Sequence, residues 1–287
     1  MAIDNNHIYP SLISIVSALE NNNREKNLLA YNLLLSFDFM KEKIKIFESL
    51  KKKYDVRINY YLIPKIFYNF RKWRMGTDSI YYKLLIPMIF PSLERILYLD
   101  GDTLIYKDLF ELYSLPLFNN YILATPSPIH EMPKNFKLKD NIYINAGVNL
   151  INIKKIRQDK KDFELLYYCS KYSHLFNLPE QDLINYVYRG NIGVLPFKYG
   201  IYLYGNVKIF KKFHSYKYKI SIKTKDIIEA LNEPTIVHLV YCEPKVWTRR
   251  TKSTFGIDYI CKYYQKEFYY FARKTDYYNE ILRKYMN

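Results

Sequence analysis

Cysteine is scarce in this sequence: the 287 residues include three, Cys169, Cys242 and Cys261. An odd, widely spaced set of this kind forms neither a disulfide framework nor the closely spaced pairs of a zinc site. Unpaired cysteines are typical of proteins that are kept in a reducing compartment. We therefore expect no disulfide framework, no zinc and a cytoplasmic location.

Long hydrophobic runs are also missing. The longest, around Leu84–Phe90, is interrupted by Pro87 and followed by Pro91, and it falls far short of the ~18 apolar residues that span a bilayer. The N-terminus lacks a basic region followed by an apolar core, so no signal peptide is expected. Hydrophobic residues nevertheless make up 49% of the chain, which is enough to build a substantial core. These features predict a soluble globular protein.

Acidic residues are few relative to basic ones: 28 Asp and Glu stand against 44 Lys and Arg, a net charge of +16. This balance favours an anionic partner, and three classes are open: nucleic acid, acidic lipid and phosphorylated small molecules. The charge is spread along the chain, with only short clusters such as Lys51–Lys53. General electrostatic steering is therefore the preferred interpretation, and no specific nucleic acid is expected. A basic nucleic-acid-binding protein, whose affinity falls steeply with salt, remains an alternative.

Apolar residues follow strand and helix patterns in alternation, which predicts an α/β fold with a doubly wound, parallel sheet. No internal repeat or low-complexity linker is visible, so we expect one domain over residues 1–250 and a helical extension over residues 251–287. Residues 200–223 show no clean period and are expected to form an irregular or β-ribbon region that covers the site. The expected strands are Ala2–Ile3, Leu28–Phe37, Val56–Ile63, Ile96–Leu99, Ile122–Thr125, Ile142–Ile153 and Thr235–Val240; the expected helices are Ser11–Glu20, Met40–Tyr54, Ser79–Phe90, Asp162–Leu175, Glu180–Tyr188 and Ile227–Leu231, with one or two more in Tyr259–Tyr285.

The most informative motif is an apolar strand, Ile96–Leu99, that ends in Asp100, Gly101 and Asp102. A run without alternation is typical of a strand buried in a parallel sheet, and ligands bind at the carboxyl edge of such a sheet. Two carboxylates at this spacing hold one hard divalent cation, to which a diphosphate adds further oxygens. Glycine between them lets the backbone approach the ligand closely. The alternative interpretation is a strand followed by an acidic turn.

Two other segments place short polar side chains at strand ends. Asp4 and Asn6 follow the first expected strand and have the groups to hydrogen-bond a base or a ribose; a polar loop or helix cap is the alternative. Asn145, Ala146 and Gly147 lie within an apolar strand, where a buried Asn needs partners that a bound sugar offers. A β-bulge is the alternative there.

Two later segments complete the candidate site. Glu180, Gln181 and Asp182 open a helix, and they either cap it or present one amide and two carboxylates to sugar hydroxyls and a reacting centre. His238 follows another short apolar strand, and lone histidines are more often structural than metal ligands. Lys245 comes soon after, and a lysine beside a metal site suits a phosphate.

These motifs occur in a fixed order along the chain: Asp4 and Asn6, then Tyr98–Ile105, Ile144–Ile153, Glu180–Asn185 and Ile228–Trp247. In this order and at these separations they resemble the motifs of the family 8 glycosyltransferases, which include bacterial lipopolysaccharide galactosyl- and glucosyltransferases and glycogenin. The resemblance runs from about Ala2 to Trp247. It implies a GT-A type nucleotide-sugar-binding, Rossmann-like α/β fold, with a mixed, mainly parallel sheet flanked by helices.

The resemblance also implies a function and residue roles. The expected reaction is transfer of a hexose-type sugar from a UDP-sugar, dependent on Mn²⁺ or, alternatively, Mg²⁺, with retention at the anomeric carbon. Glu180 stands where the family has Asp, and one extra residue separates His238 from Lys245. By position, Asp100, Asp102 and His238 are the expected metal ligands, and Ala2, Asp4 and Asn6 the uridine contacts. Lys245 is expected at the diphosphate and Lys83 at phosphate and donor sugar; Asn145, Gly147, Glu180 and Gln181 line the sugar pocket, and Gly101 and Ala146 also belong to the donor-binding set. Asp100, Glu180 and Gln181 are the expected catalytic residues.

Retention requires a covalent intermediate or attack from the face of the leaving group. Gln181, the family position nearest the anomeric carbon, carries a weakly nucleophilic amide. We therefore expect front-face substitution, in which the departing phosphate accepts the proton of the acceptor. A metal-dependent nucleotide-sugar hydrolase, a nucleotidyltransferase and a non-catalytic relative remain alternatives.

The donor sugar, the acceptor and the oligomeric state are not readable from the sequence, and the acceptor class stays open between a glycan, a lipid-linked molecule and a protein. The C-terminal stretch Lys262–Lys274 is basic and aromatic. Such a segment either docks on an anionic membrane surface or packs back onto the domain, and packing is the preferred interpretation.

Overall fold

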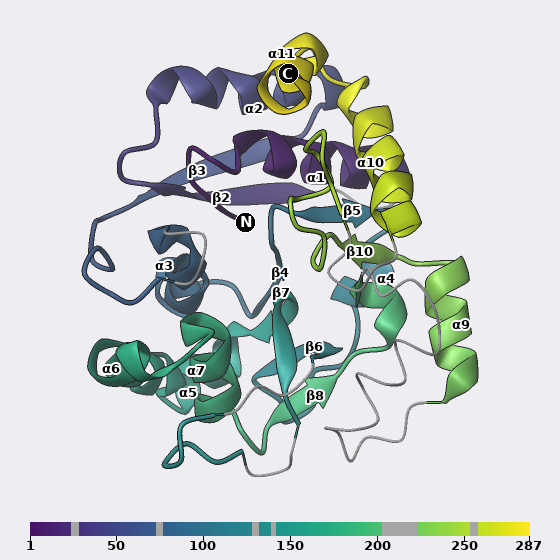
Figure 1. Cartoon of the computed structure of the whole chain (residues 1–287). Coiled ribbons are helices and arrows are strands. Elements are labelled where there is room, and N and C mark those ends of the chain that lie inside the picture. Colours follow the sequence, from purple (N-terminus) through teal and green to yellow (C-terminus); the bar gives the residue numbers. More distant parts are fainter. Residues whose placement is uncertain (24–28, 73–76, 128–131, 139–141, 203–222, 253–257) are drawn as a thin grey trace.

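A computed structural model describes residues 1–23, 29–72, 77–127, 132–138, 142–202, 223–252 and 258–287. Three small sheets and the helices around them form the fold (Figure 1). The strands are β1 Ala2–Ile3, β2 Ala30–Ser36, β3 Arg57–Ile63, β4 Arg95–Leu99, β5 Thr103–Ile105, β6 Ile122–Pro126, β7 Ile144–Asn152, β8 Ile192–Val194, β9 Ile201–Tyr202 and β10 Ile236–His238. The helices are α1 Ile8–Asn21, α2 Lys41–Tyr54, α3 Ile86–Ile89, α4 Phe110–Tyr113, α5 Ile153–Gln158, α6 Lys161–Tyr172, α7 Pro179–Val187, α9 Thr224–Asn232, α10 Asp258–Ala272 and α11 Tyr278–Met286, with 3₁₀ helices η1 Asp78–Leu85, η2 Ser173–Leu175 and η3 Phe197–Tyr199.

The first sheet has the order β1-β2-β3 and is parallel throughout, as the strand–helix alternation predicts. Its central strand β2 is apolar and largely buried, with Leu33, Leu34 and Leu35 almost fully covered. Helix α1 is buried along nearly its whole length, because Leu12, Ile15 and similar residues recur on every side of it. Because the three strands are parallel, their carboxyl ends lie at one edge of the sheet, and Asp4 follows β1 at that edge.

The second sheet has the order β4-β7-β6-β8, and here the expectation for β4 was wrong. The Asp100 strand pairs antiparallel with β7, and β6 also pairs antiparallel with β7; β8 alone runs parallel to its neighbour β6 in this sheet. A buried apolar strand looks the same in both kinds of sheet, so the run Ile96–Leu99 did not reveal its direction. Helices α5, α6 and α7 stand together beside this sheet (Figure 1).

The third sheet joins two distant parts of the chain. Strand β10 pairs antiparallel with β5, so that His238 lies opposite Thr103, one residue after Asp102. On its other edge β10 pairs parallel with β9. This pairing brings His238 to the two aspartates across more than 130 positions of sequence.

Several element predictions are confirmed with changed detail. The segment expected as a helix at Ser79–Phe90 is mostly 3₁₀ helix, followed by the short α3. Residues 203–222, which include most of the expected irregular region, lie outside the described residues, and Ile201–Tyr202 form β9. Among the described residues, no helix is long and apolar enough to cross a membrane.

The C-terminal helices pack back onto the domain, as the preferred interpretation predicts. Cys261, Phe268 and Phe271 on α10 are buried in the same core cluster as residues of α1, and Ile281 of α11 joins them. In Figure 1, α10 lies beside α1 and α11 lies beside α2. The inner face of the extension is thus part of the main core.

The structure corrects the expectation for the cysteines. Cys242 and Cys261 form a disulfide, with their Cα atoms 6.1 Å apart, whereas Cys169 is free and buried. The two partners are 19 positions apart and carry no local signal of pairing. The argument from cysteine usage to a reducing compartment therefore loses its basis.

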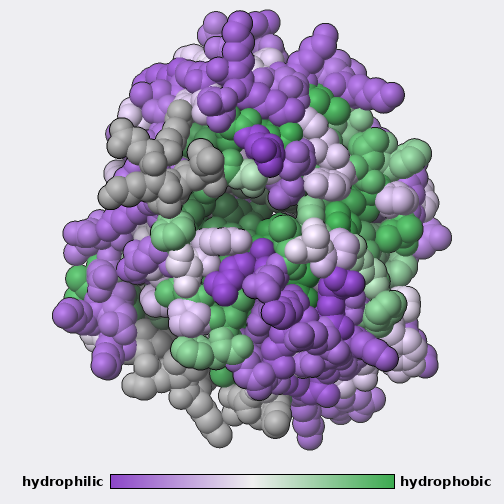
Figure 2. Space-filling model, turned by 180° about the vertical axis from the view of Figure 1, so that it is seen from behind, coloured by the Kyte–Doolittle hydropathy of each residue, from purple (hydrophilic) through white to green (hydrophobic). Residues whose placement is uncertain are grey.

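Hydrophobic side chains also surround a hollow on the face seen from behind, where polar residues occupy much of the remaining surface (Figure 2). A cavity of about 460 Å³ lies between β2 and β4, with Leu34 and Leu97 among its lining residues. None of the predicted site residues lines this cavity.

Candidate functional site

Asp100, Asp102 and His238 form one cluster at the junction of the second and third sheets. Nε2 of His238 lies 3.1 Å from Oδ1 of Asp102 and 3.9 Å from Oδ2 of Asp100. One ligand atom from each of the three side chains lies within 4.8 Å of the others. Among the described residues, these three side chains are the group of His, Cys, Asp or Glu residues that could hold a metal ion.

The imidazole of His238 is fixed by its surroundings. The side chain is 3% exposed, and a Cβ placed on Gly147 would come within 2.2 Å of its Cε1 atom. Glycine at 147 is therefore needed for the ring to occupy this position. The backbone holds the same junction, since the Asp100 amide donates to the carbonyl of Gly147 at 2.7 Å and the Leu239 amide donates to that of Asp102 at 2.8 Å.

The carboxylate of Asp100 is oriented from one side. Its Oδ1 accepts hydrogen bonds from the Tyr98 hydroxyl at 2.7 Å and from the Lys83 ammonium at 3.2 Å. Lys83 also donates to the carbonyl of Ala146 at 3.0 Å. Burial and the neighbouring Asp100 raise the pKa of Tyr98 well above its usual value, so the hydroxyl remains a donor. Oδ2 of Asp100 is the oxygen that faces His238.

Asp102 lies between the ammonium group of Lys245 and the imidazole ring of His238. Oδ2 accepts from the Lys245 ammonium at 2.9 Å, and His238 lies at Oδ1. Burial raises the pKa of Asp102, but Lys245 and His238 more than offset this, so the net pKa lies well below the usual range. Burial lowers the pKa of Lys245, and Asp102 outweighs it, so that pKa is raised. Asp102 is thus an anion and Lys245 a cation at neutral pH.

The N-terminal segment lies against this cluster. Asp4 is 6% exposed, and its carboxylate accepts from the amides of Asn6 and His7 at 2.8 and 3.0 Å and from the Ser79 hydroxyl at 3.1 Å. These bonds make Asp4 the anchor of the turn before α1, which is the structural alternative raised from the sequence. Asn6 is exposed beside it.

Two neighbours of this segment were not singled out from the sequence. Asp102 and Lys245 both influence the pKa of His7, which places its ring near the cluster. Burial lowers the pKa of His7, and its contact with Asp4 outweighs burial, so that the net pKa is raised. Tyr98 is likewise close to the backbone of Ala2. A histidine beside a polar loop and a tyrosine inside an apolar strand carry no signal of function in the sequence.

A second group of polar side chains surrounds Gln181 at the start of α7. Its Oε1 accepts from the Asn145 side-chain amide at 3.2 Å and from the Ala146 backbone amide at 3.1 Å, and its Nε2 donates to the Tyr143 hydroxyl at 3.0 Å. Gly147 completes the group by donating its amide to Asn145 Oδ1 at 2.8 Å. Sequence reasoning missed Tyr143, which lies immediately before β7, two positions before Asn145.

Buried acidic and amide groups support Gln181 from behind. Asp182, 1% exposed, accepts from the Tyr143 hydroxyl at 2.5 Å and from the Leu178 amide at 3.0 Å. Asn185 is fully buried and bonds both backbone groups of Ile144, which joins α7 to β7. The helix start is therefore locked to the strand that carries Asn145.

Glu180 is half-buried at the same helix end. Burial raises the pKa of Glu180, and the nearby Lys83 partly opposes that effect. The charge of Lys83 thus acts on both Glu180 and Asp100, which links the Gln181 group to the metal cluster. The structure accordingly brings the sequence-predicted residues into one region, with Asn6 at its exposed rim.

The donor set fits a divalent cation. Two carboxylates suit Mg²⁺ or Mn²⁺, and the imidazole favours a transition metal, so Mn²⁺ satisfies both preferences. The buried Nδ1 atom of His238 has no hydrogen-bond partner among the described residues, and Nε2 is the nitrogen that faces the carboxylates. Asp100, Asp102 and His238 are therefore a candidate site for such an ion.

The chain is similar to several known proteins. Over 252 residues the chain is 23% identical to a putative glycosyltransferase of Haemophilus influenzae. The alignment covers 83% of this chain and 69% of that protein. It is 26% identical over 159 residues to the lipopolysaccharide 1,2-glucosyltransferase of Escherichia coli, covering 53% of this chain and 47% of the relative. The crystal structure of the galactosyltransferase LgtC with donor and acceptor sugar analogs has the same fold, with a TM-score of 0.76 at 18% identity over 96% of this chain and 94% of that one.

The family assignment extends beyond single relatives. Residues 1–251, which contain every residue of the cluster and of the Gln181 group, match the family described as glycosyl transferase family 8. The mixed α/β fold is that of the GT-A structures in this family. The chain therefore belongs to glycosyl transferase family 8.

Proposed function

We propose that this protein transfers a hexose-type sugar from a UDP-sugar to a glycan, lipid-linked or protein acceptor, with retention and with Mn²⁺ as the preferred ion. The observation that carries the proposal is the cluster of Asp100, Asp102 and His238, with Lys83 and Lys245 on its two sides. Among the relatives, a lipopolysaccharide glucosyltransferase makes a glycan the first acceptor class to test.

The residues around the cluster are suited to a diphosphate leaving group. In this proposal Asp100, Asp102 and His238 hold Mn²⁺, which supplies positive charge to the diphosphate oxygens. Lys245 exchanges its contact with Asp102 for a phosphate oxygen, and Lys83 acts from the Asp100 side. Preorganised cations of this kind stabilise developing negative charge without moving a proton. Gly101, between the two aspartates, is buried, and a Cβ on it would come within 2.2 Å of the Ser11 hydroxyl oxygen, so its lack of a side chain serves the packing against α1.

The remaining contacts divide the donor into a nucleoside end and a sugar end. Ala2, Asp4 and Asn6 are assigned to uridine, at the end of β1. Asn145, Ala146, Gly147, Glu180 and Gln181 are assigned to the sugar, at the junction of β7 and α7. Because Glu180 is one methylene longer than the family's Asp, the position of its carboxylate at the sugar hydroxyls changes, and the donor must be found by measurement.

Front-face substitution agrees best with the hydrogen bonds of Gln181. Its amide oxygen already accepts two hydrogen bonds, and an amide is a weak nucleophile. Asp182 is buried and accepts from Tyr143 and the Leu178 amide, so its carboxylate is not presented as a nucleophile. In the proposed reaction the departing phosphate takes the proton from the acceptor hydroxyl. A covalent glycosyl adduct, detected by intact mass after incubation with donor alone, would overturn this step.

The function is tested first by thermal shift with a panel of nucleotide sugars, in Mn²⁺ and in EDTA. We expect one UDP-sugar to raise the melting temperature in Mn²⁺ only, and the shift to disappear in Asp102→Asn. The matched control is Asp159→Asn, which removes an exposed ion pair with Lys155 and should keep the full shift. No shift with any UDP-sugar would refute the proposal.

A second assay separates transfer from the alternative enzymes. UDP release that requires an added acceptor supports transfer, whereas equal release without acceptor indicates a nucleotide-sugar hydrolase. Release of UMP or pyrophosphate instead of UDP indicates nucleotidyl transfer.

Peripheral membrane contact is also proposed, for the outer face of α10. The inner face is buried in the core, but Tyr259, Tyr263 and Tyr270 are 63%, 54% and 50% exposed, and Lys262 and Lys266 lie among them. Aromatic and cationic side chains together favour an anionic bilayer surface. Flotation with anionic and with neutral liposomes tests this, and loss of binding in Lys262→Glu/Lys266→Glu is the expected result. Equal flotation with both liposomes would refute it.

A further inference from the structure

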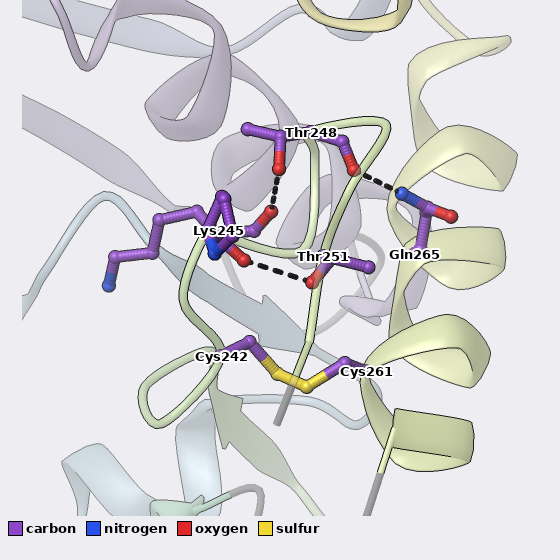
Figure 3. The surroundings of a disulfide bond; sticks show 7 residues. Cys242, Lys245, Thr248, Thr251, Cys261 and Gln265 are labelled. Carbon is purple, nitrogen blue, oxygen red and sulfur yellow. Dashed lines mark hydrogen bonds between the residues drawn. A yellow bond between two sulfur atoms is a disulfide. The ribbon is translucent and has the colours of Figure 1, made fainter. Parts of the chain in front are cut away.

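Lys245 lies in the segment Leu239–Lys252, which leaves β10 and leads toward α10. Three links tie this segment to the C-terminal helix. The disulfide joins Cys242 to Cys261, the Gln265 side chain donates to the Thr248 carbonyl at 2.6 Å, and the Tyr269 hydroxyl donates to the Trp247 carbonyl at 2.7 Å. Figure 3 shows the first two links on one side of the segment, with Lys245 extending away from α10.

The segment is also closed by its own hydrogen bonds. The Thr248 hydroxyl donates to the carbonyl of Lys245 at 2.8 Å, and the Thr251 hydroxyl donates to that of Pro244 at 3.1 Å (Figure 3). Trp247 is 6% exposed and packs against Phe268 of α10, with ring centroids 5.7 Å apart. Lys245 therefore lies in a compact turn, and α10 contacts this turn through hydrogen bonds, the disulfide and ring packing.

We propose that α10 is a positioning element for Lys245, and that Gln265, Tyr269 and the Cys242–Cys261 disulfide keep its ammonium where it contacts Asp102 in the free protein and the diphosphate in the complex. The inference rests on the proposed UDP-sugar site. It gives the C-terminal extension a role in nucleotide binding, although none of its described residues belongs to the cluster itself.

The physical reason is conformational entropy. A lysine side chain loses rotamer freedom when it is fixed, and each backbone residue that becomes ordered loses conformational entropy as well. If the turn is already ordered before the ligand arrives, binding does not have to supply that cost. The carbonyls of Trp247 and Thr248 accept hydrogen bonds from side chains of α10. Loss of these bonds would free the backbone next to Lys245.

The disulfide is suited to a permanent link. Both cysteines are fully buried, and a small dithiol reaches such a bond only when the structure opens. Variants therefore test the link more cleanly than reduction does.

The test measures UDP binding in the presence of Mn²⁺ by calorimetry, with the melting temperature recorded for each variant. Tyr269→Phe removes a hydroxyl and keeps the ring. We expect the dissociation constant for UDP to rise about fivefold, the equivalent of one lost hydrogen bond of ~1 kcal/mol. Gln265→Leu and the double variant Cys242→Ala/Cys261→Ala should weaken UDP binding in the same direction.

The matched control is Tyr277→Phe. It also removes a tyrosine hydroxyl that donates to a backbone carbonyl, that of Lys45 at 3.4 Å, but it lies outside the Lys245 turn. UDP affinity should be unchanged there. In a Lys245→Ala background, Tyr269→Phe should have no further effect on UDP affinity, because the group that it positions is gone. A purely structural role would leave the two effects additive.

The outcomes separate the two proposals. If the wild type fails to bind UDP in Mn²⁺, the proposed function is refuted, and this inference with it. If the wild type binds UDP but Tyr269→Phe and Gln265→Leu keep its affinity, or lose it equally in the Lys245→Ala background, the positioning role alone is refuted. Should one variant fail to fold, the other carries the same test.

Discussion

Replacing Gly147 by alanine tests whether the His238 ring must occupy its observed place. The new Cβ would lie 2.2 Å from Cε1 and 2.8 Å from Nδ1 of His238, whereas ordinary contacts begin near 3.4 Å. The ring must therefore retreat by about 1.2 Å, the difference between 3.4 and 2.2 Å. His238 is 3% exposed, and its strand is paired with β5, so the surroundings resist this movement.

A shift of this size is large for a metal ligand. Protein–metal distances are held to within about 0.2 Å of their ideal values. We expect Mn²⁺ affinity to fall by about 10- to 100-fold, the range found when groups that orient a ligand are changed. Overpacking should also lower the free energy of unfolding by about 1–3 kcal/mol. Electron paramagnetic resonance of free Mn²⁺ measures the first effect, and urea unfolding measures the second.

Gly101→Ala is the matched comparison. Its Cβ would also come within 2.2 Å of a neighbour, but that atom is the Ser11 hydroxyl oxygen, which has no partner among the described residues and rotates about one bond. We expect a smaller loss of Mn²⁺ affinity than for Gly147→Ala, and recovery in Gly101→Ala/Ser11→Gly. If Gly147→Ala binds Mn²⁺ as tightly as the wild type, the argument that glycine sets the position of His238 is wrong.

Three further predictions concern the groups behind the cluster. Burial raises the folded-state pKa of Glu180, so the contribution of this residue to stability is full below the unfolded pKa of about 4.3 and is lost as pH rises through the folded pKa. The melting temperature of Glu180→Gln relative to the wild type should therefore increase from pH 4 to pH 7. A difference that stays constant over this range would contradict the prediction. Asn185→Ala leaves both buried backbone groups of Ile144 without their partner, and urea unfolding should show a loss of about 3 kcal/mol. Lys83→Gln removes the ammonium that contacts Asp100, and calorimetry in Mn²⁺ should show UDP affinity at least about tenfold weaker; unchanged affinity would exclude Lys83 from the diphosphate site.

The sequence singled out residues that lie together in the structure, but it did not predict the direction of β4. Asp100 and Asp102 were singled out because they follow an apolar strand, and Gly147 because it lies within one; both are patterns of local sequence. The direction of β4 was not predictable in the same way, since pairing depends on which neighbour is adjacent in space. Cys242 and Cys261 were misjudged for a related reason: their separation of 19 positions says nothing about a Cα distance of 6.1 Å.

Some residues of the site had no signal that distinguished them. Tyr98 and Tyr143 read as apolar strand positions among 32 tyrosines, and their hydroxyls became significant once Asp100, Gln181 and Asp182 were placed beside them. The same holds for Tyr269, whose hydroxyl meets the turn that carries Lys245.

The sequence by itself determined the alternation of elements, the order of the motifs and the chemical identity of the candidate ligands, because these depend on residue type and local spacing. Tertiary structure decided which of them meet. The pairing of β10 with β5 brings His238 to Asp102, and the packing of α10 places its side chains behind Lys245. Such contacts join residues far apart along the chain, and they form where burying the whole core is most favourable, which no single segment specifies.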